Sequence, residues 1–88
     1  MYVIVVYDIQ VERLDTVRKY LKRYFNWMQN SVFEGDLTPS ELVCIRIDLS
    51  STVNKDKDCI FIYQVRSKDL LHTEVVGSPK SEPSNIIL

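Results

Sequence analysis

The chain has 88 residues, of which 45% are hydrophobic and 26% are charged, and its formal net charge is −1 at pH 7. This length suits one hydrophobic core and the composition excludes intrinsic disorder, so we expect a single globular domain. No apolar run approaches the roughly 18 residues of a membrane helix, and the opening residues lack the features of a signal peptide. We therefore expect a cytoplasmic protein with no membrane partner.

Residues 2–8 are rich in valine, isoleucine and tyrosine, which is typical of a β-strand. Both alternating sets of side chains are apolar, so this strand should be covered on both faces. It ends at Asp8, the first charged residue of the chain. On position alone this carboxylate has two readings: it hydrogen-bonds the turn that follows, or it binds a divalent cation.

Residues 12–26 predict a helix, because apolar side chains recur at three- and four-residue steps. Residues 11–25 carry a net charge of +3, whereas residues 34–58 carry −3. The basic side chains form either an ordinary solvated face or a surface that attracts a polyanion such as nucleic acid. The candidates for nucleic-acid binding are Arg13, Arg18, Lys19, Lys22 and Arg23.

Residues 29–37 read as a short strand that ends in a turn at Gly35-Asp36. A second helix is predicted to follow, running towards Val53. Thr38 can cap its first turn, Pro39 suits that turn, and Glu41 completes a capping box. Residues 54–58 then form a charged turn.

Residues 59–65 are a second strongly apolar strand, and a last strand is predicted over 71–76, stopped by Gly77. We place the folded domain at residues 1–77. Residues 78–88 are assigned to a polar linker followed by an apolar C-terminal segment, which is suited to adding a strand to a sheet edge. Cys44 and Cys59 lack metal-ligand spacing, and we expect two buried free thiols.

We assign these elements to an α+β fold of the ferredoxin-like type, with the order β-α-β-β-α-β. In that fold both helices cover one face of an antiparallel sheet, and the other face is open. Because the central strands are apolar on both faces, we expect a second copy to cover the open face and form a sheet-to-sheet homodimer. A twofold axis would also bring two copies of Asp8 together, enough carboxylates to hold Mg²⁺, with Mn²⁺ as the alternative ion.

The sequence also resembles a known family. The motif V-Y-D-I at 6–9, the basic helix and S-V-F-E-G-D-L at 31–37 are similar to the small CRISPR-associated protein of the spacer-acquisition machinery, the second numbered family in that nomenclature. The likeness covers about residues 1–76, and the apolar C-terminal end fits it.

The resemblance implies a ferredoxin-like homodimer whose C-terminal strand, within residues 78–88 here, pairs with the partner chain. It implies a metal-dependent nuclease acting on single-stranded RNA or double-stranded DNA, with Asp8 as the catalytic metal ligand and Ser31 and Phe33 in the surroundings of the active site. It also implies an adaptor that bridges integrase subunits and holds duplex DNA. Some members of the family carry an arginine just before S-V-F, where this chain has Trp27-Met28-Gln29-Asn30.

Three functions therefore stand side by side. The first is an adaptor in spacer acquisition, which needs the basic surface and the C-terminal strand. The second is a Mg²⁺-dependent endonuclease, which needs Asp8. The third is a toxin-type endoribonuclease of the virulence-associated type D kind, which shares the fold.

Overall fold

A computed structural model describes residues 1–79, and the predicted C-terminal strand within 80–88 lies outside the described residues. The elements follow the order β-α-β-β-α-β of the ferredoxin-like fold, with a short 3₁₀ turn at the end. They are β1 (Tyr2–Asp8), α1 (Val11–Leu21), β2 (Asn26–Gln29), β3 (Val32–Asp36), α2 (Pro39–Thr52), β4 (Cys59–Val65) and the 3₁₀ turn η1 (Lys68–Leu70).

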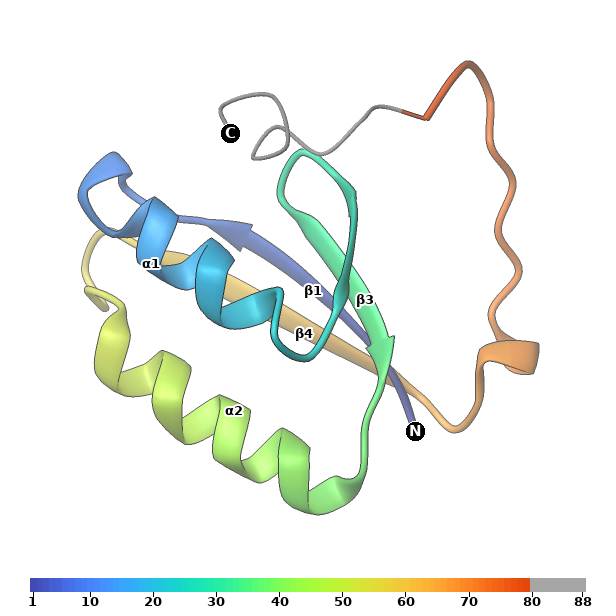
Figure 1. Cartoon of the computed structure of the whole chain (residues 1–88), viewed down its shortest axis with the longest axis horizontal. Coiled ribbons are helices and arrows are strands. Elements are labelled where there is room, and N and C mark those ends of the chain that lie inside the picture. The colour runs from blue at the N-terminus through green and yellow to red at the C-terminus, as the bar shows by residue number, and fades with distance from the viewer. Residues whose placement is uncertain (80–88) are drawn as a thin grey trace.

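The four strands form one antiparallel sheet in the order β2-β3-β1-β4. Both helices lie in front of this sheet in Figure 1 and leave its other face uncovered. The predicted α+β ferredoxin-like fold is therefore confirmed. Strand β1 occupies a central position between β3 and β4, so the residue at its end has a neighbouring strand on one side and the β2–β3 turn on the other.

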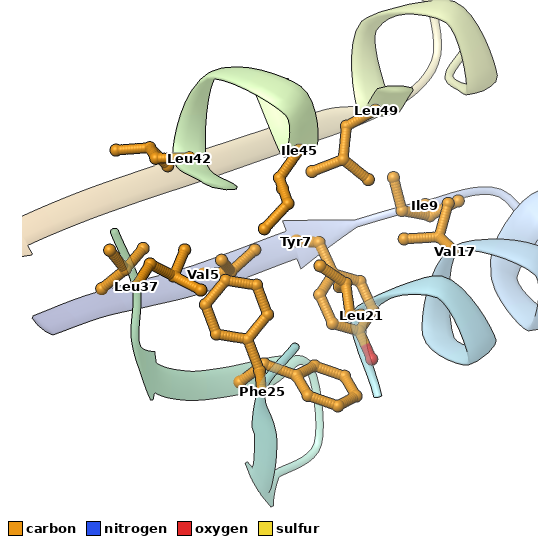
Figure 2. Close-up of a cluster of buried hydrophobic side chains, with 12 residues drawn as sticks. Val5, Tyr7, Ile9, Val17, Leu21, Phe25, Leu37, Leu42, Ile45 and Leu49 are labelled. Carbon is orange, nitrogen blue, oxygen red and sulfur yellow. The ribbon is translucent and has the colours of Figure 1, made fainter. Parts of the chain in front are cut away.

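The hydrophobic core lies between the sheet and the helices (Figure 2). Side chains of β1 and β3 that face the helices pack against one stripe of each helix. The members with the least exposed surface are Phe33, Leu21, Ile45, Val3, Val5 and Val17. These residues are apolar and recur with the periods of a strand or a helix.

Helix α2 begins where the sequence predicts. The Thr38 side chain accepts a hydrogen bond from the Glu41 backbone N–H at 3.1 Å, and the Glu41 carboxylate accepts one from the Thr38 N–H at 2.9 Å. This capping box satisfies two backbone donors that the helix itself cannot satisfy. Pro39 lies at the first helical position.

The predicted strand over 29–37 is wrong in its extent. Residues 26–36 form a hairpin of two strands, joined by the two residues Asn30 and Ser31. Asn30 adopts a φ of +36°, which asparagine tolerates better than most residues. Helix α1 correspondingly ends at Leu21 rather than near residue 26, because the chain needs the intervening residues to enter the hairpin.

Gly35 lies within β3 and not in a turn, which corrects a second expectation. A Cβ atom at this position would lie 3.1 Å from the Tyr24 carbonyl oxygen and 3.1 Å from Cδ1 of Phe25. The segment that leads from α1 into β2 therefore crosses β3 closely enough to require glycine.

The strand predicted over 71–76 is absent: these residues have no regular secondary structure. Val75 and Val76 are exposed. The composition of this segment suits a strand, but a strand requires a neighbour to pair with its backbone, and the described part of the chain pairs no strand with it.

Both cysteines are exposed, so the expectation of two buried thiols is also wrong. Cys44 lies on the outer side of α2 and Cys59 is the first residue of β4. Within residues 1–79, no helix is long and apolar enough to cross a membrane.

Candidate functional site

Asp8 lies at the end of β1 on the open face of the sheet. It pairs in register with Cys59 of β4, as Val6 pairs with Phe61 and Ile4 with Tyr63. Side chains alternate between the two faces of a strand, so Asp8 shares a face with Ile4 and Val6, opposite the core residues. The Asp8 carboxylate is exposed at the end of this face.

None of the hydrogen bonds and ion pairs recorded within residues 1–79 uses the Asp8 side chain. The carboxylate therefore does not hydrogen-bond the turn into α1. An exposed carboxylate without a protein partner fits the needs of a hard divalent cation, which binds carboxylate oxygens and keeps several waters. One such group per chain is not a complete ligand set, and residues 1–79 contain no cluster of three or more potential ligands.

The turn between β1 and α1 is held by a different aspartate, Asp58. Its side chain has no exposed surface. The Asp58 carboxylate accepts hydrogen bonds from the backbone N–H groups of Gln10 at 2.9 Å and Asn54 at 2.8 Å, and from both Nε and Nη2 of Arg13. One side chain thus joins the start of α1 to the loop before β4.

The environment of Asp58 stabilises its charged form. The hydrogen bond from Arg13 is the largest influence and lowers the pKa of Asp58; burial opposes it, and the backbone donors at Gln10 and Asn54 add to it, so the pKa stays well below its usual range. Sequence patterns alone could not find this contact, because its partners are more than forty residues apart.

The predicted nucleic-acid-binding residues of α1 are in different surroundings. Arg13 is engaged by Asp58, and Arg18 is partly buried beside Tyr7. Nε and Nη2 of Arg18 are buried and have no hydrogen-bond partner among the described residues. The exposed basic side chains of this group are Lys19, which pairs with Asp15 at 3.0 Å, Arg23, which lies over the ring of Tyr20, and Lys22.

Ser31 and Phe33 are connected to the end of β1 through Tyr7. The Ser31 carbonyl accepts a hydrogen bond from the Tyr7 N–H at 3.1 Å, and the Phe33 ring lies 6.0 Å from the Tyr7 ring, centroid to centroid. Phe33 is fully buried on the helix side of the sheet, so it cannot contact a ligand on the open face. Its ring packs against Tyr7 and so helps to position β1, the strand that ends at Asp8.

The open sheet face is apolar, as the sequence predicts. The rings of Phe61 and Tyr63 are 57% and 53% exposed and stack on each other at 6.3 Å. Ile4 and Val6 lie beside them on β1. Exposed aromatic groups next to aliphatic ones are typical of a protein contact surface.

A groove of about 320 Å³ lies on the same open face, between the β2–β3 hairpin and residues 73–79. Met28, Val32 and Glu34 line it from the hairpin, and residues 73–76 line it from the segment. Residues 71–79 therefore run past the sheet without pairing with it.

Comparison with known proteins connects these features to a family. The family model described as CRISPR associated protein Cas2 matches residues 1–73. A protein of Methanosarcina acetivorans named CRISPR-associated endoribonuclease Cas2 is 46% identical over 87 residues, covering 99% of this chain and all of that protein. The chain belongs to the Cas2 family.

Other Cas2 proteins agree with this assignment. The protein of Archaeoglobus fulgidus named CRISPR-associated endoribonuclease Cas2 2 is 46% identical over 80 residues, covering 91% of this chain and 87% of that protein. A crystal structure described as that of Cas2 superposes with a TM-score of 0.84 at 46% identity, covering 93% of this chain and 92% of that one. Cas2 of Streptococcus pyogenes gives a TM-score of 0.71 at 32% identity, covering 85% and 100%. The predicted family resemblance is confirmed.

Proposed function

We propose that this Cas2 protein acts in CRISPR spacer acquisition as a homodimer that binds duplex DNA and bridges integrase subunits. The single observation that carries the proposal is the apolar open face of the sheet, with Asp8 at its end. Cas2 family membership supports the CRISPR context. Because the chain belongs to the Cas2 family, we do not propose the toxin-type endoribonuclease, which was suggested by the shared fold alone.

The homodimer follows from the burial of this open face. Phe61 and Tyr63 are exposed to water in the single chain. Burying a large apolar side chain completely contributes roughly 1.5–3 kcal/mol of stabilisation. A twofold contact between two such faces buries both sets of rings at once. Residues 71–79 pair with no strand of the described part of the chain, and the segment that follows them would add a strand to the partner's sheet.

Duplex DNA is the proposed ligand of the basic face of α1. The exposed cations Lys19, Lys22 and Arg23 lie in the last turn of α1 and directly after it, and a dimer presents two such groups. Lysine and arginine contacts to phosphates are independent of base sequence and depend strongly on salt. These are the properties needed to hold spacer DNA of arbitrary sequence.

A second candidate function is a metal-dependent endonuclease, with RNA or DNA phosphodiesters as substrates. The unpartnered Asp8 carboxylate favours it, and the relatives named above carry endoribonuclease in their names. Asp8 from each of two protomers would hold Mg²⁺ or Mn²⁺. When bound, the ion supplies an activated water and stabilises charge on a phosphate oxygen.

A nuclease assay with paired variants tests both functions. Purified protein and Asp8→Asn are incubated with single-stranded RNA or duplex DNA, each with and without Mg²⁺. Cleavage that needs both the metal and Asp8 supports the endonuclease. Equal cleavage by both proteins, or none by either, removes Asp8 as a catalytic residue. Duplex binding by both proteins in a filter-binding titration supports the adaptor, and absence of binding at low salt contradicts it.

A further inference from the structure

We propose that a pocket between α2 and β4 is the surface that docks the integrase subunit, and that it holds an acidic, extended segment of that subunit. An aliphatic side chain of the segment fills the pocket, and a neighbouring carboxylate binds Arg46 and Lys55. This inference rests on the proposed bridging function and names the surface that performs it.

The pocket has a volume of about 250 Å³ and a largely apolar wall. Ile60 and Ile62 form the wall on the β4 side, and they alternate along the strand with the aromatic residues of the open face, so they point to the helix side of the sheet. Leu49 and Val53 form the wall on the α2 side. Ile60, Ile62 and Val53 are only partly buried, and within residues 1–79 β4 is an end strand of the sheet. An apolar wall that the chain leaves partly exposed suits an aliphatic side chain of a partner.

Two cations line the same pocket, Arg46 from α2 and Lys55 from the loop before β4. None of the ion pairs and hydrogen bonds recorded within residues 1–79 uses either side chain, whereas Arg13 is paired with Asp58. The remaining polar group of the lining, the Ser50 hydroxyl, already donates a hydrogen bond to the Arg46 carbonyl at 2.7 Å. Two cations without a partner beside an apolar wall attract a carboxylate, so charge complementarity makes the occupant acidic.

The position of the pocket suits a protein that bridges two subunits. The proposed dimer contact uses the open face of the sheet, whereas the pocket lies on the opposite side, where both helices lie (Figure 1). The cations proposed to hold DNA are in the last turn of α1 and directly after it, and none of them lines the pocket. A twofold dimer therefore carries two equivalent pockets, each separate from the dimer contact and from the DNA surface. One integrase subunit can then bind to each protomer.

Two substitutions in the pocket test this assignment in the full-length protein. Arg46→Glu reverses one cation, and Ser50→Trp places a large ring in the pocket without removing a core side chain. The matched controls are Lys57→Glu and Ser51→Trp, which make the same changes at exposed positions outside the pocket. The probe is the integrase subunit of the same organism, and biolayer interferometry measures its Kd. We expect the Kd to rise at least about tenfold in both pocket variants and to stay within about twofold in both controls.

The outcomes separate this inference from the proposed function. An unchanged Kd in both pocket variants, or equal losses in a variant and its control, overturns the docking site and leaves the bridging function standing. Failure of the natural protein to bind the integrase contradicts the bridging function itself. A lower mass of Ser50→Trp in sedimentation velocity would assign the pocket to a second copy of this chain. Weaker binding of duplex DNA by Arg46→Glu would assign the cations to phosphates, and either of these two results overturns the inference as well.

Discussion

Arg13 and Asp58 form a two-point ion pair that joins the first turn of α1 to the loop before β4, with the Asp58 side chain fully buried. Neither residue touches the open sheet face, yet the contact fixes the two strand ends that carry Asp8 and Cys59. A residue expected to bind nucleic acid thus has a structural partner, and its loss should be felt first in stability.

Replacing Asp58 by asparagine should lower the melting temperature by several degrees at pH 7. The amide keeps the size of the side chain but loses the charge that attracts the Arg13 guanidinium, and it places an NH₂ group where an acceptor is needed. Thermal unfolding followed by circular dichroism measures the change. A melting temperature equal to that of the natural protein would contradict the structural role of Asp58.

The stabilisation by Asp58 should disappear in acid. Its pKa is lower in the folded protein than in the unfolded chain, so its stabilising effect is complete above the unfolded value of about 4 and is lost as the pH falls towards the folded value. Melting temperatures of the natural protein and Asp58→Asn, measured from pH 7 to pH 2, should therefore converge at the acid end. A constant difference over this range would show that the stabilisation does not depend on the Asp58 charge.

Replacing Gly35 by alanine should destabilise the fold by about 1–3 kcal/mol, the range for forcing an extra methyl group into a packed site. The obstacle is the Tyr24 carbonyl at 3.1 Å, which belongs to the backbone and cannot turn aside as a side chain could. Urea denaturation gives the free energy of unfolding. An unchanged midpoint would mean that the segment before β2 moves away at no cost.

A charge on the open sheet face should convert a dimer to a monomer. In Phe61→Asp each protomer would bring a carboxylate into the proposed contact, where two like charges repel and are removed from water. Sedimentation velocity at micromolar concentration reports the change in mass. The matched control is Ile47→Asp, because Ile47 is similarly exposed at 63% but lies on α2. Dissociation by the control, or a dimer that survives Phe61→Asp, would contradict the sheet-to-sheet contact.

Reversing two charges directly after α1 should weaken binding to duplex DNA. The double variant Lys22→Glu and Arg23→Glu removes two cations per protomer, so the affinity at low salt should fall at least tenfold and the salt dependence should become shallower. Filter binding over a series of salt concentrations measures both. Lys55→Glu with Lys57→Glu makes the same change in net charge in the loop before β4 and should bind nearly as the natural protein does. Equal losses in both variants would point to net charge rather than to the α1 surface.

The parts of the structure that the sequence predicts are those that depend on local pattern. Strands β1 and β4 follow from their apolar residues, and α2 follows from the capping box of Thr38 and Glu41. The sequence pattern does not predict the hairpin, because Asn30-Ser31 lacks the glycine of a typical two-residue turn, although asparagine at its first position is a favourable signal.

Non-local contacts explain what the sequence could not predict. Asp58 looks like one more charge in a solvated turn until Gln10 and Arg13 are brought to it by the fold. The pairing of Asp8 with Cys59 likewise depends on the sheet order, in which β1 lies beside β4. Residues 71–76 have the composition of a strand, but a strand forms only where another strand offers its backbone.

The sheet order has a consequence for the folding of the newly made chain. Strand β1 is synthesised first but lies between β3 and β4, so one of its edges has no neighbour until β4 has left the ribosome. The pairs between β1 and β4 join residues more than fifty positions apart, and such distant contacts slow folding because a long loop must close first. Until then an apolar strand has an open edge that other chains can pair with. Folding can therefore be completed only after nearly the whole domain has been made. Raising the expression temperature should increase aggregation of this protein more than that of a protein whose contacts join residues close in the sequence.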